Sequence, residues 1–189
     1  FDEVITAWGR LGKPFGAQVF GVTPDLITTA KGITNATVPM GAVFMKESIY
    51  QAFMAGPEGA IEMPHGYTYS SHPLACAAGL ATLDVYEEEG LLTRVGELAG
   101  YWEEQAHAFK GLPNLVDIRN IGLIAAFELA PRPGAPGARG FEAHTRAFEK
   151  GAYMRVTGDI IALAPPLIIQ KTEIDQLFAI VREVLASLA

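Results

Sequence analysis

The spacing of short apolar runs and turn residues is the feature that most restricts the fold of this chain. Runs of β-branched and apolar residues predict strands at residues 2–5, 26–29 and 42–45, and a helical segment follows at 47–54. The sequence Gly-Pro-Glu-Gly at 56–59 predicts a loop. Strands that alternate with turns and helices in this way are typical of an α/β fold.

Longer helices and a second group of strands make up the remainder of the chain. Helices are predicted at 73–88, 91–109, 141–150 and 172–188, and strands at 115–120, 123–129 and 160–164. In the second of these helices the apolar residues recur with the helical period, which places Trp102 in the core. Thr172 is expected to cap the last helix. This pattern predicts a smaller α+β domain.

Composition narrows the possible partners. The chain has 189 residues, of which 50% are hydrophobic and 19% charged, so it can bury a sizeable core in one or two domains. No apolar run is long enough to span a bilayer, and a net charge of -7 with scattered basic residues argues against nucleic acid. We therefore expect neither a membrane nor a nucleic acid as a partner. We also expect no metal ion.

The single cysteine, Cys76, lies in a run of small residues and has no partner for a disulfide within the chain. We expect it to be a thiol packed in the core. No signal peptide is visible, so a reducing cytoplasm is the expected location.

Lys31 is the only charged residue between Asp25 and Lys46, and it follows a run of apolar and hydroxyl residues. Such a lysine is expected to be shielded from water. Desolvation lowers the pKa of an ammonium group and yields a nucleophilic amine, which Schiff-base chemistry with a carbonyl requires. The alternative is a loop lysine after a strand that extends into solvent.

Asp2 is predicted near the end of a buried strand, with Val4 on the same face. A buried carboxylate needs a cationic or hydrogen-bonding partner. The alternative is an aspartate that caps the following turn or helix. Together with Lys31, Asp2 fits a pyridoxal phosphate site, in which a lysine holds the aldehyde and an acid keeps the ring nitrogen protonated.

Four groups of residues, in order and spacing, resemble the class III, or omega, aminotransferases. They are DEV at 2–4 with GRLG at 9–12, AKG at 30–32 with PMGAV at 39–43, HGYTYSSHP at 65–73, and MR at 154–155 with GD at 158–159 and PPL at 165–167. The resemblance implies a fold-type I pyridoxal-phosphate-dependent transferase. Residues 1–75 would form the end of the large mixed-sheet cofactor domain, and residues 76–189 the small C-terminal domain.

The resemblance also implies roles for individual residues. Lys31 would hold the cofactor as a Schiff base and carry the proton, while Asp2 would pair with the pyridinium nitrogen. Val4 would pack on the ring. Thr68 would donate its hydroxyl to the cofactor phosphate, in this family usually across the subunit boundary of a dimer. Taken alone, Thr68 reads as an ordinary threonine of a strand or loop.

Arg155 is the expected substrate-binding residue, because a guanidinium can bind a carboxylate bidentately. In related enzymes the matching arginine swings aside for amines. The two tyrosines Tyr67 and Tyr69, with GAYMR at 151–155, favour the omega-amino acid:pyruvate branch. The implied reaction moves an amino group from beta-alanine, another omega-amino acid or a primary amine to pyruvate. Trp8 could either pack in the core or narrow the pocket entrance.

Other activities remain open at this point. An aminomutase resembling glutamate-1-semialdehyde aminomutase, or a decarboxylating transaminase resembling dialkylglycine decarboxylase, would use the same scaffold. A non-catalytic relative would keep the fold without the chemistry. The resemblance further implies a homodimer or homotetramer with a shared site, completed by an N-terminal portion of the same protein. These 189 residues alone are expected to be inactive and poorly soluble.

Overall fold

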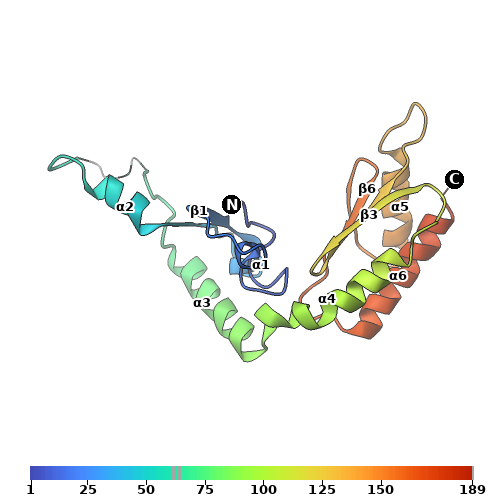
Figure 1. The fold of residues 1–189 in the computed structure, drawn as a ribbon, viewed down its shortest axis with the longest axis horizontal. Helices are drawn as coiled ribbons and strands as arrows, with labels where there is room; N and C mark the ends of the chain where they lie inside the picture. The colour runs from blue at the N-terminus through green and yellow to red at the C-terminus, as the bar shows by residue number, and fades with distance from the viewer. Residues whose placement is uncertain (61–62, 64, 189) are drawn as a thin grey trace. The chain divides into compact units, whose positions relative to one another are not determined.

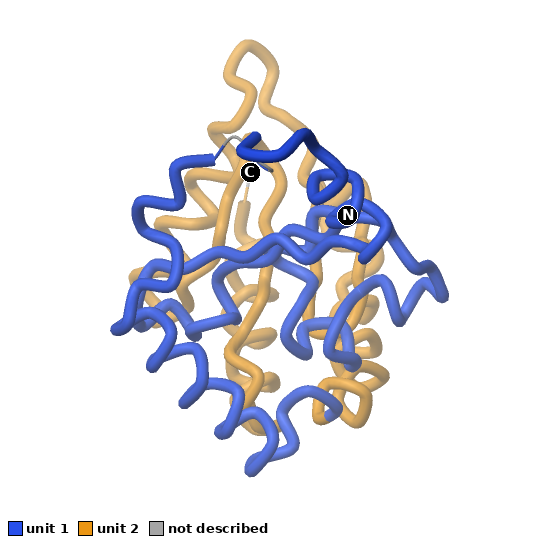
Figure 2. The backbone as a smooth tube through the Cα atoms, turned by 90° about the vertical axis from the view of Figure 1, so that its left-hand side faces the viewer, with its two compact units in different colours: residues 1–93 blue, residues 94–189 orange. Residues whose placement is uncertain are grey.

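The computed structural model describes residues 1–60, 63 and 65–188 (Figure 1). The chain divides into two compact units, Phe1–Thr93 and Arg94–Ala189 (Figure 2). The domain boundary expected between residues 75 and 76 stays a prediction, because a compact unit and a domain of the complete fold need not end at the same residue. Among the described residues, no helix has both the length and the apolar character that crossing a bilayer requires.

The first unit is built on a two-stranded antiparallel sheet, in which β1 (Leu26–Thr29) pairs with β2 (Ala42–Met45). Its helical elements are α1 (Gly16–Val19), the 3-10 turn η1 (Lys31–Ile33), α2 (Glu47–Met54) and α3 (Pro73–Glu88). The two strands, α2, α3 and the loop at 56–59 confirm their predictions. In α3 a proline occupies the first turn, where its missing N–H leaves no helical bond unmade.

The strand predicted at residues 2–5 is wrong. Asp2 forms a single parallel bridge to Thr28 of β1, and a series of turns begins at Val4. The backbone N–H of Glu3 donates to the carbonyl of Thr28 at 2.9 Å, so the chain runs beside β1 for one bridge and then leaves it.

The side chain of Glu3 explains why the chain turns here. Glu3 is 1% exposed, and its carboxylate accepts hydrogen bonds from the backbone N–H groups of Gly16 at 2.5 Å and Ala17 at 2.8 Å. The hydroxyl of Thr6 donates to the same carboxylate at 3.2 Å. These charge-assisted bonds tie the turn to the first residues of α1, where backbone N–H groups have no helical acceptor.

The second unit contains a four-stranded antiparallel sheet with the order β3-β4-β6-β5. Its strands are β3 (Leu115–Ile121), β4 (Ile124–Leu129), β5 (Arg155–Thr157) and β6 (Ile160–Leu163). The strands β3, β4 and β6 confirm their predictions. The sequence did not predict β5, because three residues are too few to reveal an alternating pattern. Pairing with β6, with Arg155 opposite Ala162, defines this strand.

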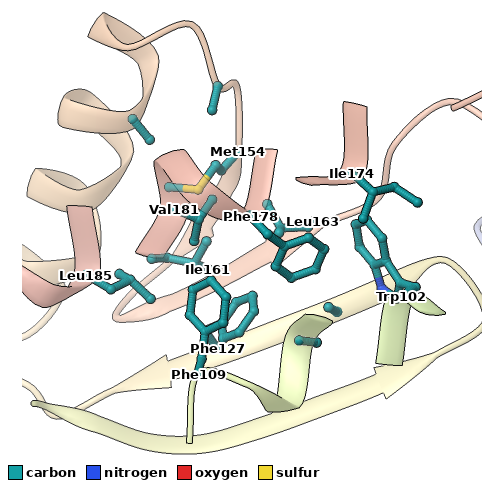
Figure 3. Packing of buried hydrophobic residues seen from close by; sticks show 14 of the residues in the cluster. Trp102, Phe109, Phe127, Met154, Ile161, Leu163, Ile174, Phe178, Val181 and Leu185 are labelled. Atoms are coloured by element: carbon teal, nitrogen blue, oxygen red, sulfur yellow. The ribbon is translucent and has the colours of Figure 1, made fainter. Parts of the chain in front are cut away.

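Three helices pack against one face of this sheet, and their bounds are α4 (Leu91–His107), α5 (Ala138–Glu149) and α6 (Lys171–Ala186). Alternate residues of β4 are buried, as expected for a sheet covered on one side. Trp102 is fully buried and its ring lies 4.8 Å from that of Phe178, which confirms its predicted place in the core (Figure 3). Phe109 and Phe127 extend the same aromatic cluster, with ring centroids 4.8 Å apart.

The start of α6 differs from its prediction. The helix begins after Gln170, and the backbone N–H of Gln170 donates to the carboxylate of Glu173 at 2.8 Å. This is the glutamate half of a capping box, in which the third helical residue binds back to the cap. The expected cap at Thr172 is therefore wrong, because Thr172 already lies inside the first turn.

Candidate active site

Lys31 is the first residue of η1 and directly follows the strand β1 and Ala30. Its backbone φ is +48°, and Asn35 and Ala36 in the same turn have φ of +49° and +60°. A left-handed conformation at a residue with a side chain costs about 1–3 kcal/mol and concentrates at functional sites. The carbonyl of Lys31 accepts the N–H groups of Ala36 at 3.1 Å and Thr34 at 3.4 Å, which closes the turn.

The side chain of Lys31 is exposed, so the expectation of a lysine shielded from water is wrong for this chain. Apolar neighbours in sequence do not produce burial here, because several are themselves on the surface: Leu26 is 44% exposed and Val43 is 57% exposed. The amine is consequently free to react with a group brought to this surface.

Trp8 packs directly on the Lys31 turn. A Cβ added to Gly32 would lie 2.8 Å from the Trp8 Cβ and 2.9 Å from its Cδ1, so only glycine fits beside this indole. Trp8 is half-buried, and its ring centroid lies 5.5 Å from that of Phe15. Of the two alternatives for Trp8, the structure favours packing, here against the residue that follows the lysine.

Asp2 is exposed and lies beside β1 through its bridge to Thr28. Its Oδ1 accepts the backbone N–H of Val4 at 3.0 Å, which is the pattern of an Asx turn. Val4 is half-buried. Asp2 and Lys31 thus belong to the same unit and are both positioned by β1, Asp2 by pairing with it and Lys31 by following its end.

Thr68 is exposed in a turn and lines a hollow of about 740 Å³ in the first unit. The described lining residues come from three segments, 38–41, 65–72 and the start of α3. Cys76 also lines this hollow and is half-buried, so the expectation of a packed core thiol is wrong. Asp2 and Lys31 are not among the described residues that line the hollow.

Arg155 lies in the second unit, as the exposed first residue of β5. The preceding residue, Met154, is 1% exposed, and its carbonyl lies 2.7 Å from Nδ1 of His144, which donates the hydrogen bond in the matching tautomer. The backbone before Arg155 is therefore anchored in the core, while the guanidinium extends from the surface.

Asp159, in the same motif as Arg155, has a structural role. Its carboxylate accepts the backbone N–H groups of Gly137 at 2.6 Å and Gly140 at 2.9 Å, and α5 consequently begins at Ala138, before the predicted residue 141. Burial alone would raise the pKa of Asp159, but these N–H bonds and the charge of Arg139 hold it below its usual value.

One residue that contacts the Lys31 turn, Tyr86, was missed by sequence reasoning as a site residue. Tyr86 is 6% exposed on α3, and its hydroxyl donates to the carbonyl of Gly32 at 2.7 Å. Burial raises the pKa of Tyr86, and the positive charge of Arg10 opposes part of this rise. Burial lowers the pKa of Arg10 itself. Tyr86 stands before a run of glutamates in the sequence, a context typical of an exposed helix end, so no local signal indicated its burial.

The arrangement suits chemistry at an amine. A lysine in a left-handed turn, a carboxylate on the neighbouring backbone and an exposed threonine hydroxyl are the kinds of group that bind the aldehyde, the ring nitrogen and the phosphate of pyridoxal phosphate. No group of three or more histidine, cysteine, aspartate or glutamate side chains that could hold a metal ion occurs in the described part of the chain.

Comparison with known proteins agrees with this fold. The family model of the class-III aminotransferases matches residues 1–185. The chain belongs to the class-III aminotransferase family.

Among its relatives is an omega-aminotransferase of Caulobacter vibrioides, which is 56% identical over 185 residues, covering 98% of this chain and 42% of the relative. A beta-alanine–pyruvate aminotransferase of Pseudomonas aeruginosa is 49% identical over 191 residues, covering 100% of this chain and 43% of the relative. The chain thus spans less than half the length of these curated relatives.

Solved structures share the fold. A pyridoxamine-phosphate-bound aminotransferase of Vibrio fluvialis superposes with a TM-score of 0.91 at 31% identity, over 100% of this chain and 44% of that chain. An (S)-enantioselective omega-transaminase of Thermomicrobium roseum has a TM-score of 0.91 at 33% identity, over 98% and 42%. The predicted fold class, the fold-type I transferase fold of these transaminases, is confirmed.

Proposed function

We propose that the complete protein is a pyridoxal-phosphate-dependent transaminase and that Lys31 binds the cofactor. The observation that carries the proposal is the Lys31 turn itself, a left-handed lysine two residues after the last residue of β1 in a chain of the class-III family. Its exposed amine is available for a covalent bond. When bound, pyridoxal phosphate supplies a protonated ring that withdraws electrons from the substrate carbon.

Each site residue has a defined task in this proposal. Lys31 holds the cofactor aldehyde and, once displaced by the substrate amine, moves a proton at the substrate carbon. Asp2 keeps the ring nitrogen protonated, because a nearby carboxylate favours a charged pyridinium. Val4 packs on the ring, and the Thr68 hydroxyl binds the phosphate.

The substrates we propose are an omega-amino acid such as beta-alanine, or a primary amine, as donor, and pyruvate as acceptor. Relatives that are 49% identical carry the names beta-alanine–pyruvate and omega-amino acid–pyruvate aminotransferase, which supports this choice. Arg155 binds the carboxylate of the acid substrates through its guanidinium fork. We further propose a cytoplasmic homodimer or homotetramer, in which Thr68 serves the site of the neighbouring subunit.

A spectroscopic titration of the complete protein tests the proposal. With pyridoxal phosphate bound, the visible absorbance should bleach when beta-alanine or a primary amine is added and return when pyruvate follows. Lys31→Ala should abolish this cycle, because no amine remains to hold the aldehyde and move the proton. Absorbance that no amine changes, or a Lys31→Ala variant that retains the full cycle, would contradict it.

Product analysis in the same experiment separates the other activities. Release of carbon dioxide indicates a decarboxylating transaminase, and an isomer formed without any keto acid indicates an aminomutase. Formation of alanine from pyruvate, in step with loss of the donor amine, is the result expected for the proposed reaction.

A further inference from the structure

The carbonyl of Gly32 is the point at which a distant helix contacts the Lys31 turn. The hydroxyl of Tyr86 on α3 donates a hydrogen bond to this oxygen at 2.7 Å, across 54 residues of sequence. The same oxygen accepts the backbone N–H of Asn35 at 3.2 Å. Tyr86 is 6% exposed, so the bond lies largely out of water, where a bond to solvent does not readily replace it.

Close packing accompanies this bond. A Cβ added to Gly79 of α3 would lie 3.6 Å from the Met40 Sδ and 3.7 Å from the carbonyl oxygen of Ile33, so α3 approaches the turn closely. Trp8 contacts Gly32 from the N-terminal segment. Apolar packing of this kind limits the space that the turn can occupy, but it does not fix the orientation of the peptide groups. A hydrogen bond to a carbonyl does fix the orientation of that carbonyl.

The turn needs such support because its backbone is strained. Lys31, Asn35 and Ala36 all have positive φ, and none of them is glycine. A conformation of this kind persists where the surroundings impose it. The Tyr86 hydroxyl binds the carbonyl of the peptide group between Gly32 and Ile33, one residue beyond the strained Lys31, so it fixes the orientation of the residue to which Lys31 is joined.

We infer that Tyr86 is a positioning residue for Lys31: by binding the Gly32 carbonyl, its hydroxyl holds the lysine backbone in the left-handed conformation that presents the amine to the cofactor aldehyde. The inference rests on the proposed function, in which Lys31 holds pyridoxal phosphate. Tyr86 acts through Gly32 and not on the reacting atoms.

The hydroxyl remains a donor at neutral pH. Burial raises the pKa of Tyr86, and the charge of Arg10 opposes part of this rise, with the net direction upward. An upward shift keeps the phenol protonated well above neutrality. The bond to Gly32 is therefore a constant feature of the site rather than a switch.

Tyr86→Phe in the complete protein tests the inference, because the change removes the hydroxyl and keeps the ring. Two ligands are compared by equilibrium dialysis against the apoprotein, without substrate. Pyridoxal phosphate can bond to the lysine amine, whereas pyridoxamine phosphate has an amine in place of the aldehyde and cannot. We expect the affinity for pyridoxal phosphate to fall about tenfold, the effect of one lost hydrogen bond, and that for pyridoxamine phosphate to stay unchanged.

Tyr101→Phe is the matched control. The Tyr101 hydroxyl also donates a hydrogen bond, to Asp175 in the second unit, so its loss should change neither affinity. Hydrogen exchange of the amides at 32–36 is a second measurement and should accelerate in Tyr86→Phe but not in Tyr101→Phe. Equal losses of affinity for the two ligands, or no loss for either, would overturn the inference.

The proposed function is checked separately in the wild-type protein. Borohydride reduction with pyridoxal phosphate, followed by peptide mapping, should place the cofactor on Lys31. A cofactor found on another residue would refute the proposed function itself, whereas labelled Lys31 with unaltered affinities in Tyr86→Phe would refute the role of Tyr86 alone.

Discussion

Gly32 illustrates how a missing side chain allows two segments to meet beside the reactive lysine. A Cβ at this position would stand 2.8 Å from the Trp8 Cβ and 2.9 Å from its Cδ1. The Trp8 Cβ is bonded directly to the backbone and cannot move away unless the backbone moves. We expect Gly32→Ala to lower the free energy of unfolding by about 1–3 kcal/mol, as overpacking does, measured by urea unfolding of the complete protein.

Gly96→Ala is the control for this prediction. Gly96 lies on α4 with open space where a Cβ would be, so alanine there should be neutral or stabilise by up to about 1 kcal/mol through its helix propensity. Adding Trp8→Gly to Gly32→Ala should remove the overlap, because glycine lacks both the Cβ and the indole, and the double variant should lose less than the two single losses combined. A Gly32→Ala variant as stable as the wild type would show that the indole can yield.

Local motifs revealed the residues expected to carry the chemistry, but not their surroundings. Lys31, Asp2 and Thr68 stand in short patterns that sequence alone displays. The support of the turn comes from Tyr86, 54 residues beyond Gly32, and a contact at that separation leaves no trace in a local pattern. The same limit explains why the exposure of Lys31 was wrongly anticipated, since burial depends on neighbours in space.

Elements with strong periodicity were predictable, and short elements defined by contacts outside their own few residues were not. The helix α4 and the strand β4 display their periods in the sequence and appeared at nearly the predicted residues. The strand β5 exists through its register with β6, and the segment at 2–5 is turned by a buried Glu3 bound to the start of α1. In both cases, contacts with residues outside the segment decided its local structure.

The start of α5 depends on one carboxylate from outside the helix, which makes a prediction at the level of the element. Asp159 accepts the N–H groups of Gly137 and Gly140, so Asp159→Ala should cost about 1–2 kcal/mol at pH 7, the value of a lost N-terminal cap. Urea unfolding measures this difference.

The pH dependence of this difference follows from the pKa of Asp159. Burial would raise this pKa, but the N–H bonds and the charge of Arg139 bring it below the usual 3.8. A carboxyl group with a lowered folded-state pKa stabilises the fold at pH values above its unfolded pKa, and this contribution is lost as the pH falls through the folded value. The gap between wild type and Asp159→Ala should therefore narrow below about pH 4.

Asp84→Ala provides the comparison for both measurements. Asp84 is exposed on α3 and makes no hydrogen bond or ion pair with the residues that the structure describes. Its removal should change stability little at either pH. A gap for Asp159→Ala that stays constant down to about pH 3 would mean that the carboxylate charge does not contribute to the cap.

At the level of the whole molecule, the residues proposed to carry the function are divided between the two units. Lys31, Asp2 and Thr68 belong to the first unit and Arg155 to the second. The first unit also exposes large apolar side chains on α3, with Leu74 at 61% and Leu80 at 65%. Exposed apolar surface of this extent is typical of faces that contact other protein surfaces.

Complementation between two inactive variants tests the proposal that Thr68 serves the neighbouring subunit. One subunit carries Lys31→Ala and the other Thr68→Ala, with different affinity tags so that mixed dimers can be isolated. If the site is shared, the mixed dimer keeps one native site out of two, because the intact Lys31 of one subunit meets the intact Thr68 of the other.

The two arrangements give different results in the same titration. With a shared site, about half of the sites in the mixed dimer should bind pyridoxal phosphate with wild-type affinity, and these sites should bleach with beta-alanine. If Thr68 instead acts within its own subunit, the subunit with the intact lysine always lacks its threonine, and no site recovers wild-type affinity. Pure Thr68→Ala protein supplies the reference affinity. The result depends on which chain provides each side chain, so a general loss of stability cannot imitate the recovery.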